Sequence, residues 1–246
     1  MQHDIQSLPV VEATSADAEG LARREVLETV RAMSRLGLSP GRSGNVSRRW
    51  GAGMLVTPSG MAYDTLAPDD IVHVGPSGEG RDGERRPSSE WRFHLAAYAA
   101  RPDIGALVHT HSMHATVLAC AHREIPAFHY MVAVAGGRGI PLVPYATFGT
   151  AALSRNVVKG LRRHEACLMA NHGQIAAGST CAHALELAAE VEILAEQYWK
   201  VLAIGKPKLL DNDEMDRVLD LFKGYGQQAQ GAAASAPSKA TRRGKA

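Results

Sequence analysis

Three histidines and one glutamate stand where they could bind a single divalent metal ion. The candidate ligands are Glu90, His109, His111 and His172. Imidazole nitrogens and a carboxylate are ligands that zinc-type ions prefer. His109 and His111 end an apolar run, and side chains two apart on a strand point to the same face. These two residues could therefore hold one ion together, so the sequence predicts a metal site.

The ligand types also indicate what such a metal could do. Three neutral imidazoles leave the charge of a divalent ion uncompensated, so the ion would remain a strong Lewis acid with an open position. Glu90 stands at the start of an expected helix, and we expect it to be a mobile fourth ligand. A carboxylate that leaves the metal when a substrate arrives can act as a base. The other histidines are expected to be structural or at the surface, with His114 left open: His73, His94, His114, His122, His129, His164 and His183.

Three short segments rich in Gly, Ser and Thr could present backbone N–H groups to an anion. Two are expected turns, at residues 41–47 and 57–60. The third is Ser88 and Ser89, which precede an expected helix, and a helix N-terminus favours a phosphate. One such turn is usually only a turn, but three beside a metal motif favour a phosphate-bearing substrate. None matches a Walker A or Rossmann pattern, so we expect no nucleotide binding.

The elements that must position these residues are helices and short strands in irregular alternation. Apolar periodicity and capping residues predict helices at 18–36, 90–101, 114–121, 181–204 and 213–222. Short apolar runs predict strands at 54–57, 71–74, 105–111, 167–170 and 174–177. Because a regular β–α–β rhythm is absent from this pattern, we expect one mixed sheet flanked by helices.

Composition indicates one globular domain. The 246 residues are 45% hydrophobic and 21% charged, which suffices for one sizeable core. A formal net charge of +2 gives no strong field for nucleic acid or a membrane surface. No apolar run approaches a transmembrane helix, and the first residues do not resemble a signal peptide, so we expect a cytoplasmic protein. Without a CxxC pair, three cysteines are expected to be buried and free of disulfides: Cys120, Cys167 and Cys181.

The two ends of the chain differ in composition from its body. Residues 1–17 are polar and aperiodic, so we expect a loose N-terminal arm. From residue 227 to 246 the chain is a basic, low-complexity segment that cannot bury enough apolar surface to order itself. We therefore expect one domain at 18–226 and a disordered tail at 227–246.

Several longer stretches resemble the class II aldolase/adducin family, and most closely its members that cleave L-fuculose 1-phosphate. The resemblance covers residues 19–226, nearly the whole expected domain. It implies a single α/β/α domain with a mixed, mostly antiparallel sheet, and a homotetramer with active sites at subunit interfaces. The matching stretches are SGNVS at 43–47, PSSEWRFHLAAY at 87–98, HTH at 109–111, IPAFHYMVAVAGG at 125–137, PYATFGT at 144–150, NHG at 171–173 and KGYG at 223–226.

Residue by residue, the resemblance assigns roles across the expected site. It implies Zn²⁺, or another ion such as Mn²⁺ or Co²⁺, on the three histidines and Glu90, which would also be the acid and base. Tyr130, by itself a packing aromatic, matches a proton donor that reaches into the neighbouring subunit's site. Phe148 and Tyr225 match residues that shape the aldehyde end. The match to the phosphate pocket covers Gly44, Asn45, Ser59, Gly60, Ser88 and Ser89.

The implied activity is that of a zinc-dependent aldehyde-lyase of carbohydrate metabolism. It would reversibly cleave a ketose 1-phosphate of the L-fuculose 1-phosphate type to dihydroxyacetone phosphate and a small aldehyde such as lactaldehyde. The metal would polarise the ketone, the C4 hydroxyl would lose its proton toward Tyr130, and Glu90 would protonate C3.

Other activities of the same family stay open. One is cleavage of 5-deoxyribulose or 5-methylthioribulose 1-phosphate, which differ only beyond the cleaved bond, where selectivity is weak. Others are dehydration and decarboxylation. Related epimerases carry Asp at the position of Glu90, which argues against epimerisation. A non-catalytic adducin-like module would have no reason to keep the ligand set. Asn171 departs from the close aldolase relatives, which carry histidine there.

Overall fold

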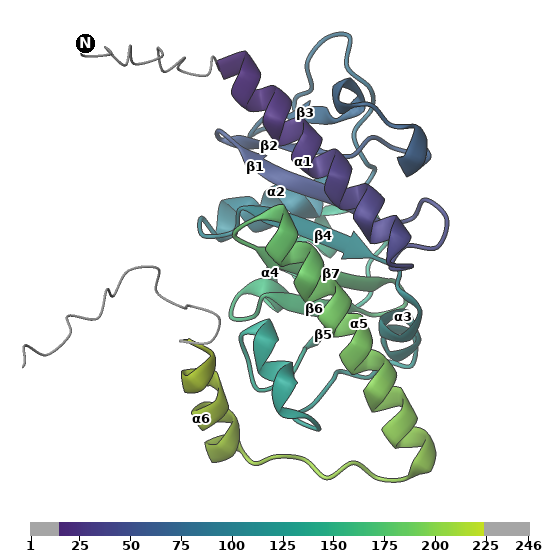
Figure 1. The fold of residues 1–246 in the computed structure, drawn as a ribbon, viewed down its shortest axis with the longest axis vertical. Coiled ribbons are helices and arrows are strands. Elements are labelled where there is room, and N and C mark those ends of the chain that lie inside the picture. The colour runs from purple at the N-terminus through teal and green to yellow at the C-terminus, as the bar shows by residue number, and fades with distance from the viewer. Residues whose placement is uncertain (1–14, 224–246) are drawn as a thin grey trace, which may run out of the picture.

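A mixed sheet forms the centre of the molecule (Figure 1). The structure is a computed structural model that describes residues 15–223. Within that range seven strands lie in the order β3-β2-β1-β4-β7-β6-β5. The pair β5 and β6 is parallel and the other neighbouring pairs are antiparallel. The strands are β1 Asn45–Trp50, β2 Gly53–Val56, β3 Val72–Val74, β4 Ala106–Thr110, β5 Leu142–Val143, β6 Ala166–Met169 and β7 Gly173–Gly178.

Helices cover both faces of the sheet. In Figure 1, α1 and α5 cross in front of the strands, and α2 and α4 lie behind them. Helix α3 belongs to the core of the front face, and α6 packs on η3. The helices are α1 Ser15–Arg35, α2 Trp91–Ala100, α3 Met113–Cys120, α4 Ala151–Leu161, α5 Cys181–Ile204 and α6 Asn212–Phe222, with 3₁₀ turns η1 Tyr63–Thr65, η2 Pro68–Asp70 and η3 Tyr130–Ala135.

The alternation of side chains along β4 determines which face receives the candidate ligands. Val108 packs into the core under α1 and α5, whereas Leu107 packs into the core under α2 and α4. His109 follows with the same period of two, and its ring meets that of Phe93 on α2 edge to face at 5.4 Å. The sheet thus directs His109 toward α2, which also begins beside Glu90.

The expectation of a mixed, mostly antiparallel sheet between two layers of helices is confirmed. Helix α5 has the expected bounds. Helix α1 begins at Ser15, so the end of the expected loose arm is helical instead. The rest of that arm, residues 1–14, and the expected tail at 227–246 lie outside the described residues.

Several elements differ from the sequence-based expectations. The expected turn at 41–47 becomes strand β1 from Asn45 onward, because pairing with both β2 and β4 outweighs the turn preference of Gly, Asn and Ser. Helix α4, η3 and β5 were not expected, because they lie in or next to a Gly- and Pro-rich segment.

The cysteines also differ from expectation. Cys167 and Cys181 are buried, as predicted, but Cys120 is exposed at the end of α3, and all three are free. Among the described helices, none is both long and apolar enough to cross a bilayer.

Candidate metal centre and phosphate pocket

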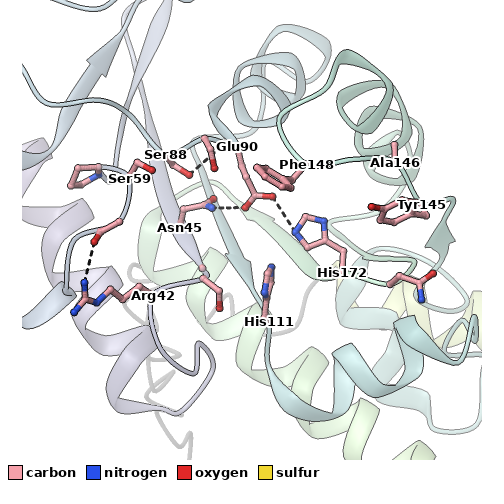
Figure 2. Close-up of a pocket in the computed structure, with 16 residues that line it drawn as sticks. Arg42, Asn45, Ser59, Ser88, Glu90, His111, Tyr145, Ala146, Phe148 and His172 are labelled. Carbon is pink, nitrogen blue, oxygen red and sulfur yellow. Dashed lines mark hydrogen bonds and ion pairs between the residues drawn. The ribbon is translucent and has the colours of Figure 1, made fainter.

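The four predicted ligands converge on one point. Figure 2 shows three of them, Glu90, His111 and His172. Glu90 lies at the N-cap position of α2, His109 on β4 and His111 one residue beyond that strand. His172 lies in the turn between β6 and β7. One potential ligand atom from each residue lies within 4.8 Å of those of the other three. The first and last of these ligands, Glu90 and His172, are 82 positions apart in the sequence and share one site.

The proton on His109 can be placed from its partner. Its Nδ1 lies 2.7 Å from the backbone carbonyl oxygen of Gln174, which can only accept, so Nδ1 carries the proton. In the neutral ring, Nε2 then carries a lone pair and no proton. It lies 3.1 Å from Nε2 of His111. It also lies 3.1 Å from Oε2 of Glu90. A divalent metal ion would satisfy the lone pairs that face one another at this distance, and it fits this donor set.

Glu90 is a buried carboxylate, with 6% of its surface exposed. Burial alone would raise its pKa, but the neighbouring imidazoles of His109 and His172 outweigh burial and hold the pKa far below its ordinary value. Its Oε1 lies 3.0 Å from Nε2 of His172. Its Oε2 accepts a hydrogen bond of 2.9 Å from the Asn45 amide. Glu90 is therefore ionised and available as a metal ligand.

The imidazole rings surround the site evenly. The ring centre of His111 lies 4.8 Å from the ring centre of His109 and 4.8 Å from that of His172. The ring centres of His109 and His172 are 4.9 Å apart. Burial, followed by the charges of the other two histidines, lowers the pKa of His111 to about 3. A neutral ring is the form that binds a metal, so this environment favours coordination. The geometry does not select among zinc and similar divalent ions.

A pocket of about 340 Å³ opens beside the metal ligands. Glu90, His111 and His172 contribute to its lining. The structure brings every predicted phosphate-binding residue to this pocket, together with Phe148 (Figure 2). These phosphate-binding residues are Gly44, Asn45, Ser59, Gly60, Ser88 and Ser89.

Backbone N–H groups of three of these residues are already used inside the protein. Gly44 donates to the Ser39 hydroxyl at 2.8 Å. Ser59 donates to the carbonyl oxygen of Arg86 at 3.0 Å, and Ser88 to that of Thr57 at 2.9 Å. The expectation that these turns expose their N–H groups is therefore wrong at these positions. The serine hydroxyls and the Asn45 amide are the remaining donors there.

Ser88 also differs from an ordinary helix cap. No side-chain bond caps α2, whose N-cap position is held by Glu90. The Ser88 hydroxyl instead accepts from the Glu90 N–H at 3.3 Å, and its carbonyl accepts from Trp91 at 3.0 Å. Ser88 thus fixes the backbone of the metal-ligating glutamate.

Two predicted residues are not part of this pocket. Tyr130 is half exposed in η3, where its ring centre lies 6.5 Å from that of Phe222. The pocket lining does not include it. Tyr225, expected at the aldehyde end, lies outside the described residues.

The lining also includes residues outside the predicted site set, among them Arg42, Tyr145 and Ala146. Arg42 donates from Nη1 to the Gly60 carbonyl oxygen at 3.2 Å, which places a cation across the mouth of the phosphate region. A basic residue inside a Gly- and Ser-rich turn was the available sequence signal. Tyr145 and Ala146 line the other side, beside Phe148. They lie in a segment without helical or strand periodicity, and the available signal was the PYATFGT stretch at 144–150 that resembles the family.

His94 was expected to be structural or exposed, and it has a connection to the site. It is fully buried on α2, one turn after Glu90, and its Nε2 contacts the Oδ1 atom of Asn45. Spacing of four residues on an expected helix could have placed it on the same face as Glu90.

Glycine is required where the strands approach the ligands. A Cβ on Gly44 would lie 2.7 Å from the carbonyl oxygen of His109. One on Gly173 would lie 2.4 Å from the carbonyl oxygen of Thr110. Both distances are below any normal contact, so a larger residue would push β4 and its histidines away from their partners.

Comparisons with known proteins agree with this fold and site. The family model described as "Class II Aldolase and Adducin N-terminal domain" matches residues 24–199. A 5-methylthioribulose-1-phosphate/5-deoxyribulose-1-phosphate aldolase of Rhodospirillum rubrum is 54% identical over 85% of this chain and 94% of its own. The L-fuculose phosphate aldolase of Escherichia coli is 48% identical over 82% of this chain and 94% of its own. A solved L-fuculose 1-phosphate aldolase superposes with a TM-score of 0.80 at 35% identity, over 87% of this chain and all (100%) of that one.

Proposed function

The chain belongs to the class II aldolase and adducin family, and from that premise we propose that it reversibly cleaves a ketose 1-phosphate with the help of a divalent metal ion. One observation carries the proposal. Three imidazoles and a carboxylate converge at one side of a pocket whose other side is a turn region of hydroxyl, amide and guanidinium donors. This arrangement suits a substrate with a carbonyl at one end and a phosphate at the other.

Each group of the site has a distinct task in this proposal. Glu90, His109, His111 and His172 hold the ion, which when bound supplies Lewis acid polarisation of the substrate carbonyl. The phosphate is held, and the bond to be cleaved is kept in register, by Asn45, Ser59, Gly60, Ser88, Ser89 and Arg42.

Proton transfer is assigned to Glu90 and Tyr130. Cleavage of the C3–C4 bond turns the C4 hydroxyl into an aldehyde, so that hydroxyl gives up a proton, and the electron pair stays on C3. In cleavage the Glu90 carboxylate takes up a proton from solvent and delivers it to C3, while the C4 proton leaves to solvent through Tyr130; in the reverse direction the carboxylate removes the C3 proton. Tyr130 exchanges the C4 hydroxyl proton in the site of a neighbouring subunit, since it lies away from the pocket of its own chain. We therefore propose a homotetramer with shared sites, in which Tyr225 helps to shape the aldehyde end.

The identity of the released aldehyde depends on which ketose 1-phosphate is the substrate. A ketose of the L-fuculose 1-phosphate type would give dihydroxyacetone phosphate and lactaldehyde. A second candidate is 5-deoxyribulose or 5-methylthioribulose 1-phosphate, supported by the 54% identical relative with that name. Ala146 and Phe148 at the pocket also favour a methyl or thioether group over a hydroxyl.

The test is release of dihydroxyacetone phosphate from the three ketose 1-phosphates, each with and without a chelator, using the zinc-loaded full chain. We expect chelator-sensitive release from at least one, and kcat/KM ranks the aldehydes. Release that a chelator does not affect would contradict the assignment of the metal site. If none of the three is cleaved, the aldolase proposal fails, and dehydration or decarboxylation of a sugar phosphate would replace it.

A further inference from the structure

Five polar side chains form a continuous, buried series of hydrogen bonds that ends at Glu90. Glu90, His94 and Tyr98 follow one another every four residues along α2, so they face the same way. Asn45 and Ser47 are two apart on β1 and face α2 together. The helix and the strand thus present matching rows of polar groups to each other.

The contacts run without a gap from one end to the other. The hydroxyl oxygens of Tyr98 and Ser47 are 2.8 Å apart. The Ser47 oxygen lies 2.8 Å from Nδ1 of His94. Nε2 of His94 contacts the amide oxygen of Asn45. The amide nitrogen of Asn45 lies 2.9 Å from Oε2 of Glu90.

Chemistry fixes the direction of every bond in this chain. The Glu90 carboxylate can only accept, so the Asn45 amide turns its NH₂ toward Glu90 and its oxygen toward His94. His94 must then donate from Nε2, and in a neutral ring Nδ1 accepts from Ser47. Because the Ser47 hydroxyl donates its proton to His94, the Ser47 oxygen accepts a hydrogen bond from the Tyr98 hydroxyl. All four bonds point toward the carboxylate.

Burial keeps this direction fixed. Ser47 and His94 are fully buried, and Asn45 and Tyr98 are nearly so. Burial, followed by the charge of His109, lowers the pKa of His94 to about 3, so the ring stays neutral. Burial raises the pKa of Tyr98 well above its ordinary value, so it keeps its proton. Apolar residues of similar size could fill this space with little loss of stability, so a packing role alone does not explain five linked polar groups.

We propose that His94 is a positioning residue, which orients the Asn45 amide and through it holds the Glu90 carboxylate against the metal-binding histidines. The inference rests on the proposed function, since it assigns Glu90 to the metal. One Asn45 N–H is committed to Glu90, so the second is the one left for the phosphate. Asn45 therefore joins the two ends of the substrate site, and His94 sets its orientation for both.

The test compares His94→Leu, which removes both ring nitrogens, with His94→Gln, whose amide N–H can still donate to Asn45. Affinity for Zn²⁺ alone is measured by competition with a chelator, and the folded fraction by circular dichroism. We expect His94→Leu to bind Zn²⁺ about 10–100-fold more weakly. His94→Gln should recover most of that loss. The matched control is His73→Leu, which replaces a histidine on β3 and should leave Zn²⁺ affinity unchanged.

The outcomes separate positioning from packing. If folded His94→Leu binds Zn²⁺ like the wild type, or if Gln is no better than Leu, the inference is overturned. If His94→Leu does not fold, ¹⁵N NMR of the wild-type protein measures the tautomer of His94 instead. We expect the Nε2–H tautomer between pH 6 and 8, and the Nδ1–H tautomer would overturn the inference. Neither readout depends on turnover, so a failure of the aldolase proposal is seen separately as absence of product with the wild type.

Discussion

The Nε2 atom of His122 lies 2.7 Å from the side-chain oxygen of Asn171. Both residues have left-handed backbones, with φ of 52° and 54°. Asn171 also donates its N–H to the carbonyl oxygen of Ala119 at 3.2 Å. Because Asn171 directly precedes the ligand His172 and lines the pocket, this contact ties the end of α3 to the metal site.

The Asn171 contact predicts a pair of distinguishable variants. Asn171→Ala should cost about 1–2 kcal/mol of unfolding free energy, because alanine resists a left-handed backbone. Asn171→Gly accepts that backbone and should be closer to the wild type in stability. Both lose the side chain, so both should change the kcat/KM ratio among the three ketose phosphates. Chemical denaturation and product assays measure the two effects, and equal stability of the Ala and Gly variants would contradict the backbone explanation.

Removal of the carboxylate charge should separate metal binding from proton transfer. In Glu90→Gln the three imidazoles and the phosphate donors stay in place, so Zn²⁺ and inorganic phosphate should still bind at saturating concentrations, although Zn²⁺ affinity falls at least as far as in His94→Leu. Proton exchange at C3 should fall by a factor of about 10²–10⁴, because the amide is no base. Exchange of the C3 proton of dihydroxyacetone phosphate with D₂O, followed by NMR, is the measurement. Loss of Zn²⁺ from this variant would show that Glu90 is mainly a structural ligand.

Metal binding should also stabilise the fold. An ion held by four ligands from three separate segments of the chain binds the folded chain in preference to the unfolded one. At a hundred times its Kd, such an ion contributes about 2.7 kcal/mol. For a domain of this size that is a rise in Tm of about 5–10 °C. Differential scanning calorimetry with and without Zn²⁺ tests this, and the rise should vanish in His172→Ala.

A methyl group at Gly44 should weaken the junction of β1 and β4. The added Cβ would lie 2.7 Å from the His109 carbonyl oxygen and 2.8 Å from the Ser39 hydroxyl oxygen. We expect Gly44→Ala to lose about 1–3 kcal/mol of unfolding free energy and to weaken Zn²⁺ binding. Gly80→Ala is the matched control, since its Cβ would have no atom within 4 Å. Equal denaturation midpoints for the two variants would disprove the steric assignment.

Acid should release the contact between α1 and the loop before α2. A hydrogen bond from Arg81 lowers the pKa of Glu19 to about 2, against burial, and Arg23 adds to the effect. A carboxyl whose pKa is depressed in the folded state stabilises the fold above its unfolded pKa of about 4.5. That contribution is lost as the pH falls from about 5 to 2. Glu19→Gln should therefore flatten this part of the pH–stability curve. Glu28→Gln, an exposed change on the same helix, is the control, and an unchanged slope in Glu19→Gln would refute the prediction.

The sequence by itself predicted the cluster of candidate metal ligands and the main helices. Coordination depends on residue type, and the strand period brings His109 and His111 to one side before any tertiary contact is known. The bounds of α5 followed from apolar periodicity, and in the structure Thr180 and Gly205 cap its ends. These features are local, so neighbouring residues suffice to predict them.

Only the tertiary structure decided how the ligands are held and which donors remain free. Asn45 became a strand residue through pairing with β2 and β4, and its amide joins Glu90 to His94 across 45 and 49 positions of the chain. The backbone N–H groups of Ser59 and Ser88 donate to carbonyl oxygens that are distant in the sequence. The physical reason is that each buried polar group must find a partner, and folding brings that partner from a remote segment that no local pattern identifies.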